Sequence, residues 1–336
     1  MSEKIKTRLK AAKNTARKKL KKIFVFFITG LISVLPGSAK INYVKITAFA
    51  ESVYDGKFSQ RANAMTYQIL IALIPMLLAL FSITSLFDEN FRLQMLDFAE
   101  LAVPDYVWPA VSDVISGVML NQNKTLFYSA LGTGLFFSTK MIYSVFGYLN
   151  DSRQKTKQHN FIIKILLSIV MSAAAYAAVI SSVAVFIAVS YAINWSNSNF
   201  LHSQAAGIYG ILLFKWFFLF GTVYIFISAL FYFAYADKRF FKFFSTGSGL
   251  STALFVVLIY ALKVYFQYFN NYNLIYGSLG ALFALLFCIN WMCTALLFGF
   301  ELNISIYRQN ITDELASSVK KLFDKAQKFL QDLGKT

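Results

Sequence analysis

The stretch AGIYGILLFKWFFLFGTVYIFISALFYFAY, residues 206–235, decides the fold class of this chain. Its only charged side chain is Lys215, and apolar and aromatic residues fill most of the remaining positions. A helix needs about 20 such residues to cross the hydrocarbon core of a bilayer. Lys238, Arg239 and Lys242 follow directly, and clusters of positive charge are typical of the cytoplasmic end of a span. This stretch therefore predicts a membrane-spanning helix.

Five other segments resemble this one in length and composition. The chain is 57% hydrophobic and only 14% charged, whereas soluble domains carry about 25% charged residues. We predict an all-α membrane protein, a bundle of six transmembrane helices with amphipathic surface helices. The predicted spans are residues 63–87, 126–149, 161–192, 206–235, 244–269 and 275–300.

The placement of basic residues predicts the orientation of these spans. The chain has 32 Lys and Arg residues and a net charge of +16. Only Arg92 and Lys124 lie in the predicted outer connections, and most of the others lie in the two tails and in alternate short loops. Because cytoplasmic loops carry the excess of Lys and Arg, both termini are expected in the cytoplasm. The same placement argues against a nucleic-acid partner.

Three regions follow from this division: a basic cytoplasmic or interfacial region at 1–61, a membrane domain at 62–301 and a cytoplasmic helical tail at 302–336. The membrane domain includes an outer amphipathic loop at 88–125. The first region is interpreted either as a segment that binds anionic lipid headgroups or as a solvated tail that sets orientation. Residues 23–35 are interpreted as interfacial or re-entrant, with a full span as the alternative.

Lys140, Lys215 and Lys263 lie within the second, fourth and fifth predicted spans, and we call them the span lysines. A lysine at the bilayer centre costs at least about 2.5–3.5 kcal/mol on insertion scales. One interpretation is that all three snorkel to the interface. The other is that they line a water-filled cationic cavity that attracts phosphate or carboxylate groups.

Two further polar residues are candidate binding positions. Glu301 ends the sixth predicted span, where it would pair with a neighbouring base, bind a proton or serve as an ordinary interfacial acid. Asn150 ends the second span, and an amide in this position commonly joins helices by hydrogen bonds.

The sequence carries no motif for a catalytic or metal centre. The only histidines are His159 and His202, which are too few for a zinc site built on histidine. The acids are scattered over the outer loop and the tails, whereas a two-metal nuclease needs clustered carboxylates. We therefore expect no enzymatic activity, no metal and no cofactor.

Several motifs in this order resemble those of the YihY/BrkB family of bacterial inner-membrane proteins, formerly labelled as ribonucleases. The first stretch runs from Ala62 through Tyr67 to Pro75, and the second is Tyr148–Asp151. The third stretch combines Lys263, the segment YNLIYGSLG that contains Tyr272, Tyr276, Gly277 and Gly280, and the segment Gly299–Glu301. The family resemblance makes these motif residues structural candidates, with Asn150, Lys263, Tyr276, Gly277 and Glu301 the first to test.

The resemblance implies six spans, cytoplasmic termini and a place in the bacterial cytoplasmic membrane as a multi-pass protein. It leaves the function open, because members have been described as ribonucleases, serum-resistance factors and transporters. The residues themselves favour a translocator of an anionic solute or lipid. The alternative is a non-catalytic scaffold for envelope assembly with envelope protein partners. Small-residue faces on the spans are also compatible with a homo-oligomer.

Overall fold

The part of the chain that the structure describes is helical, with short connecting segments and no strand. In this computed structural model the described residues are 49, 52–53, 56–84, 86–102, 112–113, 115–117, 124–151, 159–199, 205–236, 242–268, 283 and 285–307. The helices are α3 (Gly56–Thr84), α4 (Glu89–Ala102), α6 (Lys124–Asn150), α7 (Phe161–Asn199), α8 (Ala205–Ala234), α9 (Thr246–Tyr268) and Leu285–Tyr307, which we call the last helix.

Four of the described helices are long and apolar enough to cross a membrane. They are Lys57–Thr84, Phe161–Val189, Leu213–Ala234 and Leu285–Tyr307. Within α9 a shorter apolar helix covers Thr246–Leu262. The chain is thus an integral membrane protein with several spans. The count of six spans and the side of the termini remain predictions, because four of the described helices are long and apolar enough to cross a membrane.

The helices do not begin and end where the predicted spans do. Helix α3 begins at Gly56, ahead of the predicted start at 63, and the last helix continues past Phe300 to Tyr307. The continuation is stabilised by burial, because Leu302 and Ile304 are almost completely shielded from solvent. Helix α7 has 39 residues, about 58 Å at ~1.5 Å per residue, so it tilts strongly or extends beyond a hydrocarbon core of ~30 Å.

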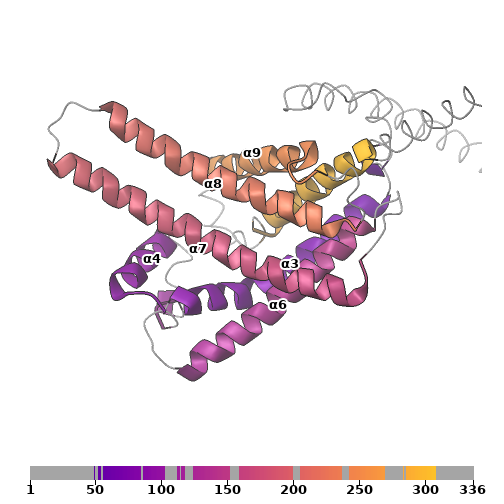
Figure 1. Ribbon diagram of the computed structural model, residues 1–336, viewed down its shortest axis with the longest axis horizontal. Helices are drawn as coiled ribbons and strands as arrows, with labels where there is room; N and C mark the ends of the chain where they lie inside the picture. The colour runs from indigo at the N-terminus through magenta and orange to yellow at the C-terminus, as the bar shows by residue number, and fades with distance from the viewer. Residues whose placement is uncertain are drawn as a thin grey trace, which may run out of the picture.

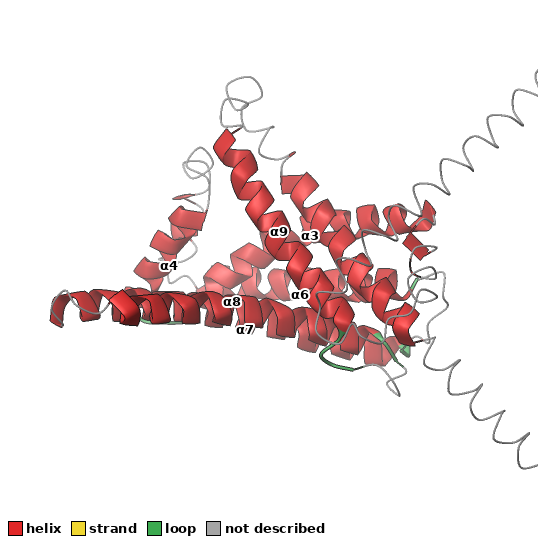
Figure 2. Ribbon diagram, turned by 90° about the horizontal axis from the view of Figure 1, so that it is seen from above, coloured by secondary structure: helices red, strands yellow, loops and turns green. Residues whose placement is uncertain are grey.

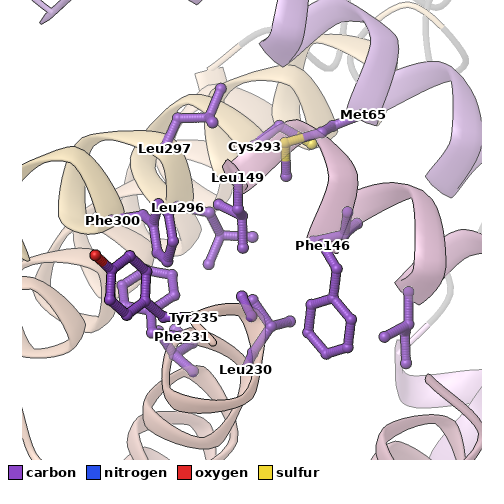
Figure 3. Packing of buried hydrophobic residues seen from close by; sticks show 14 of the residues in the cluster. Met65, Phe146, Leu149, Leu230, Phe231, Tyr235, Cys293, Leu296, Leu297 and Phe300 are labelled. Atoms are coloured by element: carbon purple, nitrogen blue, oxygen red, sulfur yellow. The ribbon is translucent and has the colours of Figure 1, made fainter. Parts of the chain in front are cut away.

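The main hydrophobic core, whose packing Figure 3 shows, lies at one end of the bundle, which we call the closed end. There α3 begins, and α6, α8 and the last helix end. Phe58, Leu149, Phe231 and Phe300 are among its buried side chains, and the rings of Phe231 and Phe300 pack edge to face with centroids 5.4 Å apart. The side chains of this core interlock α3, α6, α8 and the last helix at the closed end.

Away from the closed end the helices diverge (Figures 1 and 2). Helices α7 and α8 continue side by side as a long pair, while α3, α6 and α9 lean away from it. Large apolar side chains in these halves are exposed: Ile74 of α3 is 68% exposed, Phe136 of α6 is 64% exposed and Phe217 of α8 is 79% exposed. In lipid such residues need no protein partner, because hydrocarbon solvates them.

Amphipathic helix α4 covers part of the diverging region. Its Met95 packs with Ile115 and with Val183 of α7, next to Phe81 of α3. The apolar periodicity at 91–103 predicts a helix here, and α4 occupies residues 89–102. The apolar face of α4 lies on the spans, and its acidic residues lie on the exposed face.

Small residues and side-chain hydrogen bonds join α9 to the last helix. A Cβ added at Gly299 would collide with Ser251 and with the backbone of Gly247, so the two backbones touch. Ser251 Oγ donates to the carbonyl of Ala295 at 2.9 Å. Across the same contact, Asn303 Oδ1 accepts from the N–H of Gly247 at 2.8 Å, which satisfies a donor that the first turn of a helix leaves free.

Several predicted features lie outside the described residues. They are the basic region up to residue 48, including 23–35, the family-motif residues Tyr272, Tyr276, Gly277 and Gly280, and the tail from residue 308. The side chain of Lys263 is outside them as well.

We predict that Gly299→Ala destabilises the protein by about 1–3 kcal/mol, the usual cost of overpacking a tight contact. The added methyl group would meet Ser251 and the backbone of Gly247. Thermal unfolding of the purified protein in detergent measures the change. Gly221→Ala in α8 is the matched control, since a Cβ there meets nothing within 4 Å. Equal melting temperatures for both variants would contradict the close packing.

Candidate functional site

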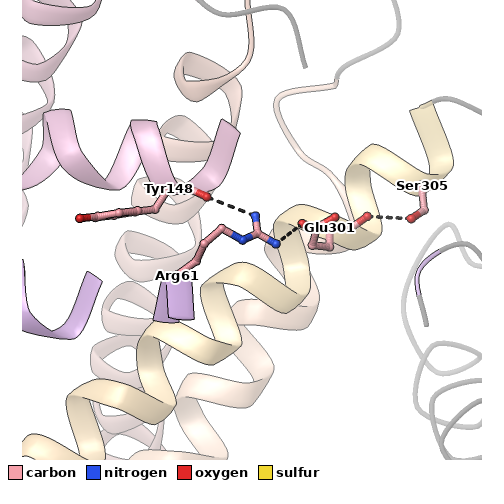
Figure 4. Close-up of polar contacts among 4 residues, drawn as sticks. All are labelled: Arg61, Tyr148, Glu301 and Ser305. Atoms are coloured by element: carbon pink, nitrogen blue, oxygen red, sulfur yellow. Dashed lines mark hydrogen bonds and ion pairs between the residues drawn. The ribbon is translucent and has the colours of Figure 1, made fainter. Parts of the chain in front are cut away.

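A buried ion pair joins the first and last described spans at the closed end. Arg61 of α3 donates from Nη2 to Oε1 of Glu301 in the last helix at 2.6 Å (Figure 4). The Arg61 side chain is 5% exposed and that of Glu301 is 0% exposed. These two are the only buried charged side chains in the part of the chain that the structure describes. The pair is therefore the strongest electrostatic feature of the described bundle.

Arg61 also joins a third helix to the pair. Its Nη1 donates to the backbone carbonyl of Tyr148 at 3.2 Å, in the last turn of α6. The last four carbonyls of a helix have no partner within the helix, and a positive charge near this end is favourable. The guanidinium also lies 5.7 Å from the ring centroid of Phe58. One side chain thus closes the end of α6 and neutralises Glu301.

Two more side chains close the end of α8. Asn150 Nδ2 donates to the carbonyls of Phe146 at 2.9 Å and Ala234 at 2.7 Å. Nε2 of His159 lies 3.0 Å from the carbonyl of Phe233, which can only accept a hydrogen bond. The carbonyls of Ala234 and Phe233 lie in the last turn of α8 and have no partner within the helix. Asn150 therefore ties the end of α8 to α6, and His159 ties it to the segment before α7.

Of the three span lysines, the structure describes the side chains of Lys140 and Lys215, and these two have different surroundings. Lys140 of α6 is exposed. Lys215 of α8 places Nζ 3.4 Å from the ring centroid of Phe186 of α7, a cation–π contact within the α7–α8 pair. The convergence of Lys140, Lys215 and Lys263 on one cationic cavity therefore remains a prediction.

The family-motif residues have different environments. Tyr67 is 61% exposed on α3, and Pro75 lies inside the same helix, which continues to Thr84. The carbonyl of Pro75 lies 2.6 Å from the position of a Cβ added at Gly134 of α6, so the two helices touch there. Pro75 is thus part of a close helix contact.

Sequence reasoning missed Arg61 and Asn303. The sequence places Arg61 at the end of the basic region 1–61 and Asn303 in the predicted tail, although both side chains are buried. One signal was present: Arg61 directly precedes the motif that begins at Ala62, within an uninterrupted helical segment. Lys164, whose Nζ lies 3.9 Å from the ring centroid of Tyr143, also received no role.

No metal centre is visible in the described part of the chain. No group of three or more His, Cys, Asp or Glu side chains comes together there as a metal site would require. Cys288 and Cys293 are both free thiols.

By its fold and this site, the chain is a multi-pass integral membrane protein whose helices are joined by a buried ion pair at one end. The sequence profile of the family described as "Virulence factor BrkB" matches residues 49–321. The chain belongs to this family. No match was found among the curated proteins or among the solved structures.

We predict that Arg61→Gln and Glu301→Gln each destabilise the fold by about 3–5 kcal/mol, because each removes one member of a buried ion pair. The double variant Arg61→Gln/Glu301→Gln is expected to lose much less than the sum, because it carries no buried charge. Chemical unfolding of the four proteins in detergent gives the double-mutant cycle. Additive losses would show that the two side chains are not coupled.

Proposed function

We propose that this chain is a translocator of an anionic solute or lipid in the bacterial cytoplasmic membrane, with six spans and cytoplasmic termini. The observation that carries the proposal is the asymmetric packing of the bundle. The core, the ion pair and the side chains that close α6 and α8 all lie at the closed end, while the helices diverge away from it. Many secondary transporters alternate access by rocking one group of helices against another around a fixed binding site.

The distribution of charge supports an inward-facing closed end. The closed end is where α6 and α8 terminate, and these helices lead into the segments that carry Arg153, Lys155, Lys238 and Arg239. By the positive-inside rule this end faces the cytoplasm. The described conformation would then be sealed toward the cytoplasm and spread toward the outer face.

The chemistry of the spans supports an anionic cargo. Among the described side chains, Lys140 and Lys215 are basic residues in predicted spans with no acidic partner, and Lys215 rests on Phe186 between α7 and α8. No buried acid other than Glu301 is present among the described residues, and Glu301 already pairs with Arg61. A translocation path near Lys140 and Lys215 would repel cations and favour anions that carry a phosphate or carboxylate group. The proposal includes no enzymatic activity.

A second candidate function, a scaffold for envelope assembly, is favoured by α4. Its outward face carries Glu89, Asp97 and Glu100, all exposed, above the apolar face that packs on the spans. Such a face suits a basic protein partner. If this candidate is right, replacing these three acids by their amides abolishes the cellular phenotype, while Lys215→Gln leaves it intact.

We predict that the purified full chain, reconstituted into liposomes, moves fluorescent phosphatidylglycerol or a soluble organic anion faster than protein-free liposomes do. Lys215→Gln is expected to slow this movement about 3- to 10-fold, the worth of one favourable cation contact of ~1 kcal/mol. Lys242→Gln is the matched control, because Lys242 is exposed in the connection before α9. Liposomes in which neither cargo moves above background would contradict the translocator.

A further inference from the structure

The guanidinium of Arg61 uses only part of its hydrogen-bonding capacity. One Nη2–H contact reaches Glu301 and one Nη1–H contact reaches the carbonyl of Tyr148. The Nε of Arg61 is buried and has no hydrogen-bond partner among the described residues. Arginine normally meets a carboxylate or a phosphate through two parallel hydrogen bonds. Here the carboxylate of Glu301 accepts from Nη2 alone, and the neighbouring Nε–H of Arg61 donates to no acceptor among the described residues.

The charge balance limits how the closed end can open. Arginine stays protonated in proteins, so burial cannot neutralise it by loss of its proton. Separating α3 from the last helix would leave Arg61 without its carboxylate in a poorly solvated place, which is strongly unfavourable. An incoming anion reduces this penalty, because it can take the place of the carboxylate on Arg61. Opening would then be favoured only when a suitable anion is present.

We propose that Arg61 is the anion-binding residue of the translocation path and that Glu301 is its resident counter-anion, displaced by the phosphate group of the cargo. This inference rests on the proposed function. It assigns the binding step to the closed end, where three helices meet at one side chain. The span lysines then attract the cargo, while Arg61 selects it.

A phosphate ester fits this site better than a simple carboxylate. Its tetrahedral oxygens can accept from Nε and from a terminal nitrogen together, which Glu301 does not do. A phosphate ester therefore has hydrogen bonds to gain on replacing Glu301. The ester is either the headgroup of a phospholipid or a soluble organic phosphate, and the two share the recognised group.

The test measures binding to the purified full chain in neutral detergent, with two probes. Dihexanoyl phosphatidylglycerol represents the lipid source, and glycerol 3-phosphate represents the soluble source. Glu301→Gln is expected to bind one of the two probes about tenfold more tightly than the unmodified chain, because the competing carboxylate is gone. The probe that gains identifies the source.

Two further variants keep the result interpretable. Arg61→Gln/Glu301→Gln carries no buried charge and is expected to lose saturable binding of that probe. Glu301→Asp keeps the pair neutral but shortens the acid, so it is expected to bind about threefold more tightly, between the unmodified chain and Glu301→Gln. It replaces Glu301→Gln if that variant does not fold. Lys57→Gln, which removes an exposed charge one turn before Arg61, is expected to bind as the unmodified chain does.

Three results would overturn the inference. In the first, the folded double variant binds the probe as tightly as Glu301→Gln does, and in the second, both acid variants bind both probes with unchanged affinity. In the third, Lys57→Gln loses as much affinity for the probe as the double variant does. Transport is scored separately in liposomes. If the acid variants gain affinity but the unmodified chain moves neither cargo, the translocator fails and the binding site stands. If cargo moves and the affinities do not change, the translocator stands and the role of Arg61 is wrong.

Discussion

The rest of the structure depends on the requirement that a buried charge be paired. Arg61 and Glu301 belong to helices at opposite ends of the described chain, and each lowers the cost of burying the other. Their pairing brings the start of α3 against the last helix, and the carbonyl of Tyr148 adds the end of α6. The hydrophobic core forms around this point, with Phe58, Phe231 and Phe300 among its buried residues.

The same logic governs the neutral polar groups of the closed end. Helix ends expose carbonyls and N–H groups, and a membrane interior offers no water to satisfy them. Asn150 and His159 serve the end of α8, and Asn303 serves the start of α9. Each contact joins a helix end to another part of the chain, so the same hydrogen bonds satisfy the backbone and hold the bundle together. This explains why amides and small residues, and not large apolar side chains alone, hold these helices in register.

The diverging end is governed by a different balance. Apolar side chains such as Phe136 and Phe217 lose little by facing lipid, so the hydrophobic effect does not draw the helices together there. The diverging end is held by fewer contacts, such as those of α3 with α6 at Pro75 and Gly134 and the packing of Met95 on Val183. That division is compatible with the proposed translocator, in which Arg61 at the tightly packed end would select the cargo.

The sequence by itself determined the class of the protein and the approximate position of its helices. Apolar runs at residues such as 161–192 and 206–235 correspond to α7 and α8, because in lipid only a helix satisfies every backbone group within the segment. Family membership was also readable, from motifs including the one that begins at Ala62. What only the tertiary structure decided was the pairing of Arg61 with Glu301 and the burial of Asn303. Sequence reasoning assigned Arg61 to a basic tail because local composition reports the average environment of a segment. It does not report which distant side chain supplies the opposite charge, and that depends on how three helices meet in space.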